Sequence, residues 1–198
     1  ANPMSFFSIV IPLYNKEAYI LQTLQSVCKQ SFSDFEILVI NDGSTDRSLE
    51  ETAKVKDTRL KIITQKNQGV SHARNLGMQQ AKGSYIALLD ADDLWVPNYL
   101  EKIHALTKEF PQEAVFSCAA HISKKGLTKK AVYSIPDKPV QKINYFRGSQ
   151  KSSMLHPSSV VLHRSVFIKL GGFDTRYSNY EDIDYWFRIG LHYEVVFA

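Results

Sequence analysis

Apolar runs alternate with segments of helical periodicity over the first 120 residues of this chain. Short apolar runs bounded by turn residues are typical of buried strands. They predict strands at 7–11, 35–40, 60–64, 85–89 and 115–119. Between the strands, apolar residues recur at helical spacing, and Asn15 and Pro97 are expected at the starts of the first and fourth helices. Strands that alternate with helices predict an α/β fold with a central, mostly parallel sheet flanked by helices.

The pattern loosens after residue 120. We expect a strand at Ser158–His163, a short helix at 165–170 and a longer helix at 181–191. A length of 198 residues fits one domain. Residues 194–198 begin a strand and stop without a terminus-like sequence, so we expect the chain to be truncated there.

Composition narrows the class of protein. Apolar residues make up 44% of the chain and charged residues 22%, as in ordinary globular domains. No run of 18 apolar residues occurs, and residues 1–5 lack the features of a signal peptide. Cys28 and Cys118 have no metal-binding spacing and fit thiols in a reducing compartment. We therefore expect a cytoplasmic protein, and no nucleic-acid partner.

The net charge of +4 is concentrated in one segment. Residues 124–151 contain eight basic residues and one acidic residue, Asp137. The basic residues are Lys124, Lys125, Lys129, Lys130, Lys138, Lys142, Arg147 and Lys151. A basic patch indicates contact with phosphates or with the anionic inner face of a membrane. The alternative is a solvated, lysine-rich hairpin.

An acidic cluster, Asp90-Ala91-Asp92-Asp93, directly follows the fourth apolar run. In an open parallel sheet, ligands bind where the strands end. Three carboxylates within four residues repel one another unless a cation lies among them, and such oxygen ligands suit Mg²⁺ or Mn²⁺. The alternative is an acidic turn that caps the next helix.

Three further segments are expected at the same edge of the sheet. Residues 12–14 and 41–43 follow the first and second strands, and Tyr14 can stack on a planar ring. Asp42 can accept two N–H or O–H donors. Residues 69–75 open a helix that carries Arg74, and both helix amino ends and arginine favour phosphate. Together these segments predict a site for a nucleoside diphosphate.

These segments carry a resemblance. The strings FSIVIPLYN, ILVINDGSTD, NQGVSHARN and YIALLDADD resemble, in order, the motifs of family 2 glycosyltransferases with the GT-A fold. The similarity runs from residue 7 to residue 190. It implies a single GT-A domain over 1–198, with a nucleotide-sugar half at about 5–120 and an acceptor half at about 121–198. The implied activity is inverting transfer of a sugar, most commonly from UDP, to a saccharide or lipid-linked acceptor in polysaccharide biosynthesis.

The resemblance assigns the nucleotide sugar a set of binding residues at the strand ends: Pro12, Tyr14, Asn15, Asp42, Arg74, Asp90, Ala91 and Asp92. Within this set, the nucleobase is lined by Pro12, Tyr14 and Asp42. Arg74 approaches the base or the diphosphate, and Asp90 contacts the ribose. Asp92 binds the divalent ion, Mn²⁺ or Mg²⁺.

The segment Tyr180–Arg188 is similar to the acceptor side of that family, where a carboxylate of a Glu-Asp pair acts as the base. A base must reach the acceptor hydroxyl opposite the leaving diphosphate, and a helix start suits an ionised carboxylate. Asp182 is the first candidate and Glu181 the second. Trp186 has the spacing of a core residue, and His156 is a further candidate for substrate contact.

Two other functions fit parts of the sequence. A haloacid-dehalogenase phosphatase also carries a DxD motif after an apolar strand, but near its amino terminus, whereas four strand–helix units come first here. A catalytically inactive module that binds a nucleotide sugar would keep the donor motifs. The retained Glu181–Asp182 pair argues against that second alternative.

Overall fold

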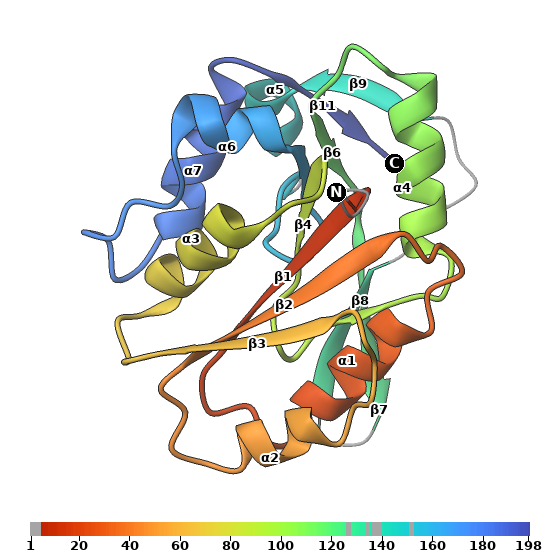
Figure 1. Cartoon of the computed structure of the whole chain (residues 1–198). Coiled ribbons are helices and arrows are strands. Elements are labelled where there is room, and N and C mark those ends of the chain that lie inside the picture. The colour runs from red at the N-terminus through yellow and green to blue at the C-terminus, as the bar shows by residue number, and fades with distance from the viewer. Residues whose placement is uncertain (1–4, 126–127, 134, 136–139, 151–152) are drawn as a thin grey trace.

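The computed structural model describes residues 5–125, 128–133, 135, 140–150 and 153–198 (Figure 1). Within these residues, eight strands form the larger sheet, in the spatial order β3 (Leu60–Gln65), β2 (Phe35–Asp42), β1 (Phe7–Leu13), β4 (Tyr85–Leu88), β10 (Val161–His163), β6 (Val115–Ser117), β11 (Glu194–Phe197) and β9 (Gln141–Asn144). A smaller sheet has the order β5 (Leu94–Trp95), β8 (Thr128–Tyr133) and β7 (Ala120–Lys125).

The larger sheet is mostly parallel, as the sequence predicts. β1 pairs in parallel with β2 and β4, β2 with β3, and β6 with β11. β10 runs antiparallel between β4 and β6, and β9 runs antiparallel to β11. Central parallel strands are buried on both faces, which explains why β1 and β2 read as nearly continuous apolar runs.

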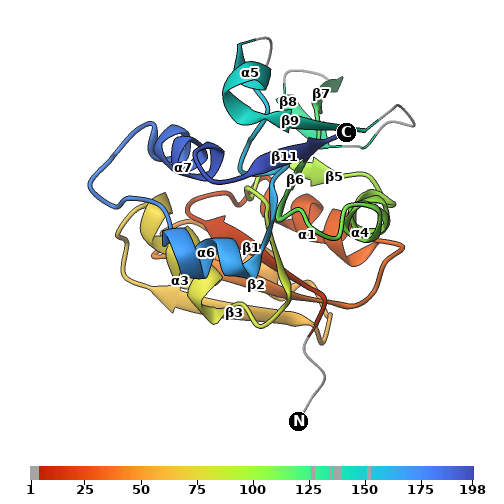
Figure 2. The same ribbon diagram turned by 90° about the horizontal axis from the view of Figure 1, so that it is seen from above.

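Helices cover both faces of this sheet (Figure 2). α1 (Ile20–Cys28) and α4 (Tyr99–Glu109) lie on one face, and α3 (Val70–Gln80), α6 (Arg164–Leu170) and α7 (Glu181–Gly190) lie on the other. The helices on each face pack against the strands, and a separate cluster of buried apolar residues lies on each side of the sheet. α2 (Ser48–Ala53) follows β2, and α5 (Tyr145–Ser149) follows β9. The α/β fold predicted from the alternating pattern is confirmed.

Several predicted boundaries are wrong. Asn15 does not start the first helix, because α1 begins at Ile20 and Asn15 has a left-handed backbone (φ 51°). Pro97 precedes the fourth helix, which begins at Tyr99. The strand expected from residue 158 begins only at Val161, because residues 157–159 form a turn.

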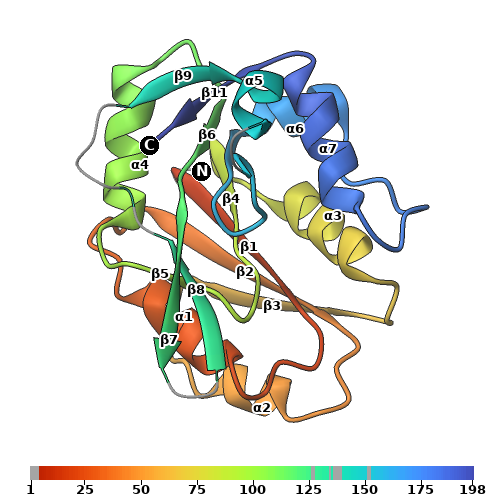
Figure 3. The same cartoon turned by 180° about the vertical axis from the view of Figure 1, so that it is seen from behind.

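The lysine-rich segment forms part of the smaller sheet. β7 and β8 pair antiparallel beside β5 (Figure 3), as in the hairpin alternative. Lys138 and Lys151 lie outside the described residues, as do the side chains of 120–130, so most of the predicted basic patch does too. Lys142 is paired with Glu113 and Glu194. Among the described residues, none of the helices is long and apolar enough to cross a membrane.

Gly77 on α3 provides a test of how closely this helix packs on the sheet. A Cβ atom there would lie 2.2 Å from a methyl carbon of Val10 and 3.2 Å from a side-chain carbon of Ile40. We expect Gly77→Ala to lower the free energy of unfolding by about 1–3 kcal/mol, because overpacking outweighs the better helix propensity of alanine. Urea unfolding measures the change. Gln79→Ala on the exposed side of the same helix is the control and should change stability by less than about 0.5 kcal/mol. Equal stability of both variants would contradict the packing argument.

Candidate active site

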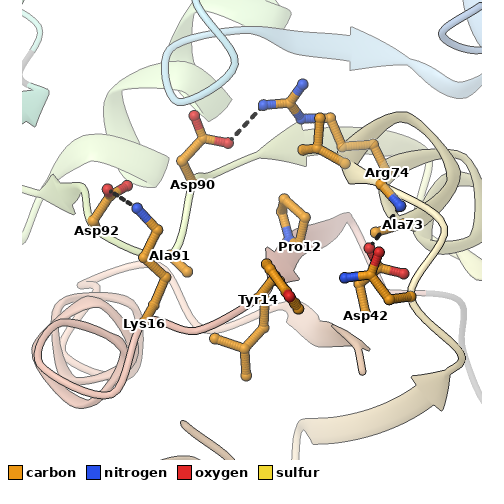
Figure 4. A pocket seen from close by; sticks show the side chains of 13 residues that line it. Pro12, Tyr14, Lys16, Asp42, Ala73, Arg74, Asp90, Ala91 and Asp92 are labelled. Atoms are coloured by element: carbon orange, nitrogen blue, oxygen red, sulfur yellow. Dashed lines mark hydrogen bonds and ion pairs between the residues drawn. The ribbon is translucent and has the colours of Figure 1, made fainter. Parts of the chain in front are cut away.

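A cavity of about 430 Å³ opens where β1, β2 and β4 end, beside the amino end of α3 (Figure 4). The residues that line it are Pro12, Leu13, Tyr14, Lys16, Asp42, Asn67, Gly69, Val70, Ala73, Arg74, Asp90, Ala91 and Asp92. Pro12 and Tyr14 lie between Asp92 on one side and Asp42 on the other. The parallel strands thus bring seven of the eight residues predicted to bind a nucleotide sugar to one cavity.

Asp42 holds the loop that closes one side of this cavity. Its Oδ1 accepts hydrogen bonds from the side chain of Gln65 (2.7 Å) and the backbone N–H of Gln68 (2.9 Å), and its Oδ2 accepts from the N–H of Gly69 (2.8 Å). Gly69 has φ 96°, a left-handed value that suits glycine, and α3 starts at the next residue. Asp42 therefore shapes the cavity, and its contact with a nucleobase stays a prediction.

Asn15 is the predicted binding residue that does not line the cavity. Its side-chain oxygen accepts the backbone N–H groups of Thr45 (2.8 Å) and Asp46 (3.3 Å). These bonds join the loop after β1 to the loop before α2. Asn15 is thus engaged in loop contacts next to the cavity.

Arg74 connects the two sides of the site. Its guanidinium lies 2.9 Å from Asp90 Oδ1 and 3.1 Å from Glu181 Oε1. The side chain of Arg74 is only 5% exposed, and its Nε has no hydrogen-bond partner among the described residues. An arginine forked between two carboxylates fixes the amino end of α7 relative to the end of β4.

Lys16 and Asp92 form a second ion pair at the cavity. The Nζ of Lys16 lies 2.5 Å from Asp92 Oδ2, and both side chains are 38% exposed. Figure 4 shows this pair on the side of the cavity opposite Asp42. The carboxylate predicted to bind the divalent ion is therefore already neutralised by a side chain.

Carboxylates and an imidazole approach one another beside this pair. One ligand atom each of Asp90, Asp93 and His156 lies within 4.8 Å of the others. Burial raises the pKa of the Asp93 carboxyl, which accepts a hydrogen bond of 2.6 Å from the hydroxyl of Ser158. Carboxylate oxygens are ligands of Mg²⁺ and Mn²⁺, while imidazole suits transition ions, so this set fits Mn²⁺ better than Mg²⁺. Asp92 is not in the set, and its own metal contact stays a prediction.

The two candidate bases point to different neighbours. Glu181 is held by Arg74, whereas Asp182 lines a second cavity of about 380 Å³ with Tyr145, Phe187 and others. His156 lines this second cavity, and one of its ring nitrogens lies within 4.8 Å of a carboxylate oxygen of Asp90, which lines the first cavity, so the two cavities lie close together. Asp182 thus faces open space next to the predicted donor site. Trp186 is 2% exposed, which confirms its predicted place in the core.

Sequence reasoning missed Lys16 and Asn67 as residues that line the cavity. It also did not place Asp93 next to His156, which lies 63 residues further along the chain. Asn67 is the first residue of the string NQGVSHARN and Lys16 directly follows the string FSIVIPLYN, so the motifs themselves were the available signal. The meeting of Asp93 and His156 had none, because it depends on where β10 joins the sheet.

Comparison with known proteins identifies the same family that the sequence motifs indicate. Residues 8–171 match the family model described as Glycosyl transferase family 2. An uncharacterized glycosyltransferase of Rickettsia typhi is 29% identical over 185 residues, which are 91% of this chain and 57% of that protein. Glycosyltransferase GlyG of Streptococcus pneumoniae is 33% identical over 111 residues, which are 54% of this chain and 37% of that protein. The chain thus covers less than two thirds of either relative.

Solved structures share the fold. TarS of S. aureus in complex with UDP superposes with a TM-score of 0.81 at 23% identity, over 97% of this chain and 57% of that one. The mannosyltransferase PcManGT from Pyrobaculum calidifontis, in complex with GDP-Man and Mn²⁺, has a TM-score of 0.73 at 18% identity, over 100% of this chain and 55% of that one. The predicted GT-A fold is confirmed, and the family match over residues 8–171 shows that this chain belongs to glycosyl transferase family 2.

Proposed function

We propose that this chain is the catalytic domain of an inverting glycosyltransferase that uses a nucleoside-diphosphate sugar, with a UDP-sugar as the first candidate. The observation that carries the proposal is the adjacency of two cavities. One is lined by the strand-end residues and Arg74, and the other by Asp182. In this proposal residues 5–120 hold the donor and residues 121–198 meet the acceptor, a saccharide or a lipid-linked sugar.

The donor cavity suits a nucleoside diphosphate in size and chemistry. Tyr14 is 47% exposed and offers a planar face for a base. Asp42 and the N–H groups that it orders define the end of the cavity furthest from Asp92. Solved structures with the same fold are complexes with UDP, UDP-GlcNAc or GDP-Man, which supports a nucleotide-sugar donor.

A divalent ion bound by Asp92 or by the Asp90–Asp93–His156 group would supply positive charge to the departing diphosphate. The chain's own residues provide the remaining functions. Arg74 holds Asp90 in position at the end of β4. Ala91 is buried, and its carbonyl accepts a hydrogen bond of 2.9 Å from Thr23, which fixes the turn that carries Asp92.

Asp182 is the proposed base. Its carboxylate would take the proton of the acceptor hydroxyl while the hydroxyl oxygen forms a bond to the anomeric carbon. The bond from that carbon to the diphosphate oxygen breaks, and its electron pair leaves with the nucleoside diphosphate. Attack from the face opposite the leaving group inverts the anomeric configuration. Glu181 is less suited, because its carboxylate is occupied by Arg74.

A donor screen tests this proposal. Thermal unfolding of the chain is followed with UDP-, GDP- and dTDP-sugars, each with and without Mn²⁺. A ligand that binds the folded state raises the melting temperature, because it adds to the free energy of unfolding. The added free energy is about 2.7 kcal/mol at a ligand concentration one hundred times its Kd. We expect a UDP-sugar with Mn²⁺ to give the largest shift. No shift with any nucleotide sugar would contradict the proposal.

Turnover separates the enzyme from the inactive alternative. A donor that binds but is neither transferred nor hydrolysed by the chain would favour a nucleotide-sugar-binding module. Release of free UDP, measured with the sugar that gives the largest thermal shift, would favour the enzyme. The phosphatase alternative is wrong, because the family match covers most of the chain.

Membrane contact remains a proposal that depends on residues largely outside the described part of the chain. It would bring the domain to a lipid-linked acceptor at the inner face of a membrane. Among the described residues, Arg147 on α5 is exposed and would contribute.

A further inference from the structure

The side chain of Lys16 lines the donor cavity and pairs with Asp92, a contact that the sequence around Lys16 does not predict. Lys16 lies on the loop after β1, and its backbone N–H donates a hydrogen bond of 2.7 Å to the hydroxyl of Ser48 on α2. This bond fixes the backbone, while the side chain reaches into the donor cavity and ends 2.5 Å from Asp92. A long, flexible side chain on a fixed backbone can change partner without moving the loop.

The charged residues that line the cavity show which cation is able to leave its partner and bind a diphosphate. Asp42, Asp90 and Asp92 line it, and the lining cations are Lys16 and Arg74. Arg74 is 5% exposed and bonded to two carboxylates, so it has little freedom to move. Lys16 is 38% exposed, and within the part of the chain that the structure describes its one ion pair is with Asp92. Of the two cations, Lys16 is therefore the one that can turn to an incoming diphosphate.

The ammonium group of Lys16 and a divalent ion would repel each other if both lay against the carboxylate of Asp92. A diphosphate changes this balance, because lysine binds phosphate oxygens as a point charge. Binding of the nucleotide would draw Lys16 away and leave Asp92 free for the ion. Each ligand would thus promote binding of the other, since coupling between two ligands is reciprocal.

We propose that Lys16 is an exchangeable cation of the donor site: it neutralises Asp92 in the ligand-free protein and moves to the diphosphate when the nucleotide and the divalent ion bind. This inference rests on the proposed donor site. It adds a residue that makes metal and nucleotide binding interdependent, and it assigns a cation to the diphosphate.

The test removes the charge of Lys16 and measures binding alone. Lys16→Met keeps much of the side chain's length and loses the ammonium. The affinity for Mn²⁺ is measured by electron paramagnetic resonance with and without saturating UDP, and the affinity for UDP by calorimetry without metal. We expect Lys16→Met to bind Mn²⁺ alone about fivefold more tightly, the upper range for one partly exposed ion pair. Metal-free UDP should bind about fivefold more weakly, and the gain in Mn²⁺ affinity that UDP produces should shrink about fivefold.

Lys54→Met is the matched control. Lys54 also forms an ion pair with one carboxylate, Glu51, but it does not line the cavity. The same substitution there should leave both affinities as in the parent, and each variant should lose no more than about 1 kcal/mol of stability, the upper range for one partly exposed ion pair.

The outcomes are distinct. If Lys16→Met binds Mn²⁺ and UDP as Lys54→Met does, the inference is overturned while the donor site stands. Weaker Mn²⁺ binding without UDP would overturn it too, because it would show that Lys16 supports the metal site. If the parent binds neither UDP nor Mn²⁺, the proposed donor site itself fails, and the inference fails with it.

Discussion

Replacing Asp182 by Asn should reduce sugar transfer about 10²–10⁴-fold, the usual contribution of a general base, and leave UDP affinity close to that of the parent. Asn has nearly the shape of Asp and cannot take a proton from the acceptor hydroxyl. Because Asp182 faces the second cavity and not the donor cavity, the donor should still bind. Single-turnover transfer from the sugar identified by the donor screen measures the chemical step, and calorimetry measures UDP affinity.

Two neighbouring carboxylates serve as controls. Asp184 lies on the same helix, pairs with Arg188 at 2.8 Å and lines neither of the two cavities. The variant Asp184→Asn should therefore transfer sugar like the parent. Glu181→Gln should affect the rate less than Asp182→Asn does, because Glu181 is bonded to Arg74. Near-parent transfer by Asp182→Asn would show that the base lies elsewhere, with Glu181 as the next candidate.

The grouping of the strand-end residues around one cavity was predictable because it depends on local patterns and one topological rule. β1, β2 and β4 each end in a motif, and parallel strands joined by helices bring their carboxyl ends to one edge. Burial on both faces makes these strands read as apolar runs, so both the strands and their ends could be located. The convergence of Tyr14, Asp42 and Asp90 on one cavity follows from that.

The second half of the site was less predictable because its contacts are long-range. β10 is three residues long and inserts antiparallel between β4 and β6, a pairing with no local signal. That insertion brings Ser158 and His156 to Asp93. Asn15 shows a different limit. Asparagine tolerates left-handed backbone and also caps helices, and the sequence alone does not say which of these roles applies.

The ion pairs that Lys16 and Arg74 form at the cavity were not predictable for a third reason. A side chain such as Lys16 can reach several partners from one backbone position, and charge balance in the folded site decides among them. The pairing of Arg74 with Glu181 likewise joins residues 107 positions apart. Both motifs were found in the sequence, but the bond between them depends on how α7 packs beside α3.

That bond underlies the largest expected effect on stability. Arg74→Met removes a 5% exposed guanidinium from between Asp90 and Glu181 and leaves both carboxylates without their cation. Breaking a buried ion pair by removing one partner costs about 3–5 kcal/mol. Because the side chain of Asp90 is 25% exposed and gains solvation, we expect the lower end, about 3 kcal/mol, from urea unfolding. Arg176→Met, which removes an 84% exposed arginine paired with Asp174, should leave stability unchanged.

A double-mutant cycle separates the bridge from simple loss of packing. In Arg74→Met combined with Glu181→Gln, the second change removes a carboxylate that the first left unpaired. The double variant should therefore lose less stability than the sum of the single variants, with a coupling of about 1–3 kcal/mol. Additive losses would mean that Arg74 stabilises the fold through its packing. One such contact is with Phe173, whose ring centre lies 5.1 Å from the Cζ of Arg74. A measured coupling would instead establish that Arg74 is linked energetically to Glu181, at the start of the helix that carries Asp182. Arg74 also pairs with Asp90, which is predicted to bind the donor. Donor affinity should then fall in Arg74→Met even at temperatures where the variant is fully folded.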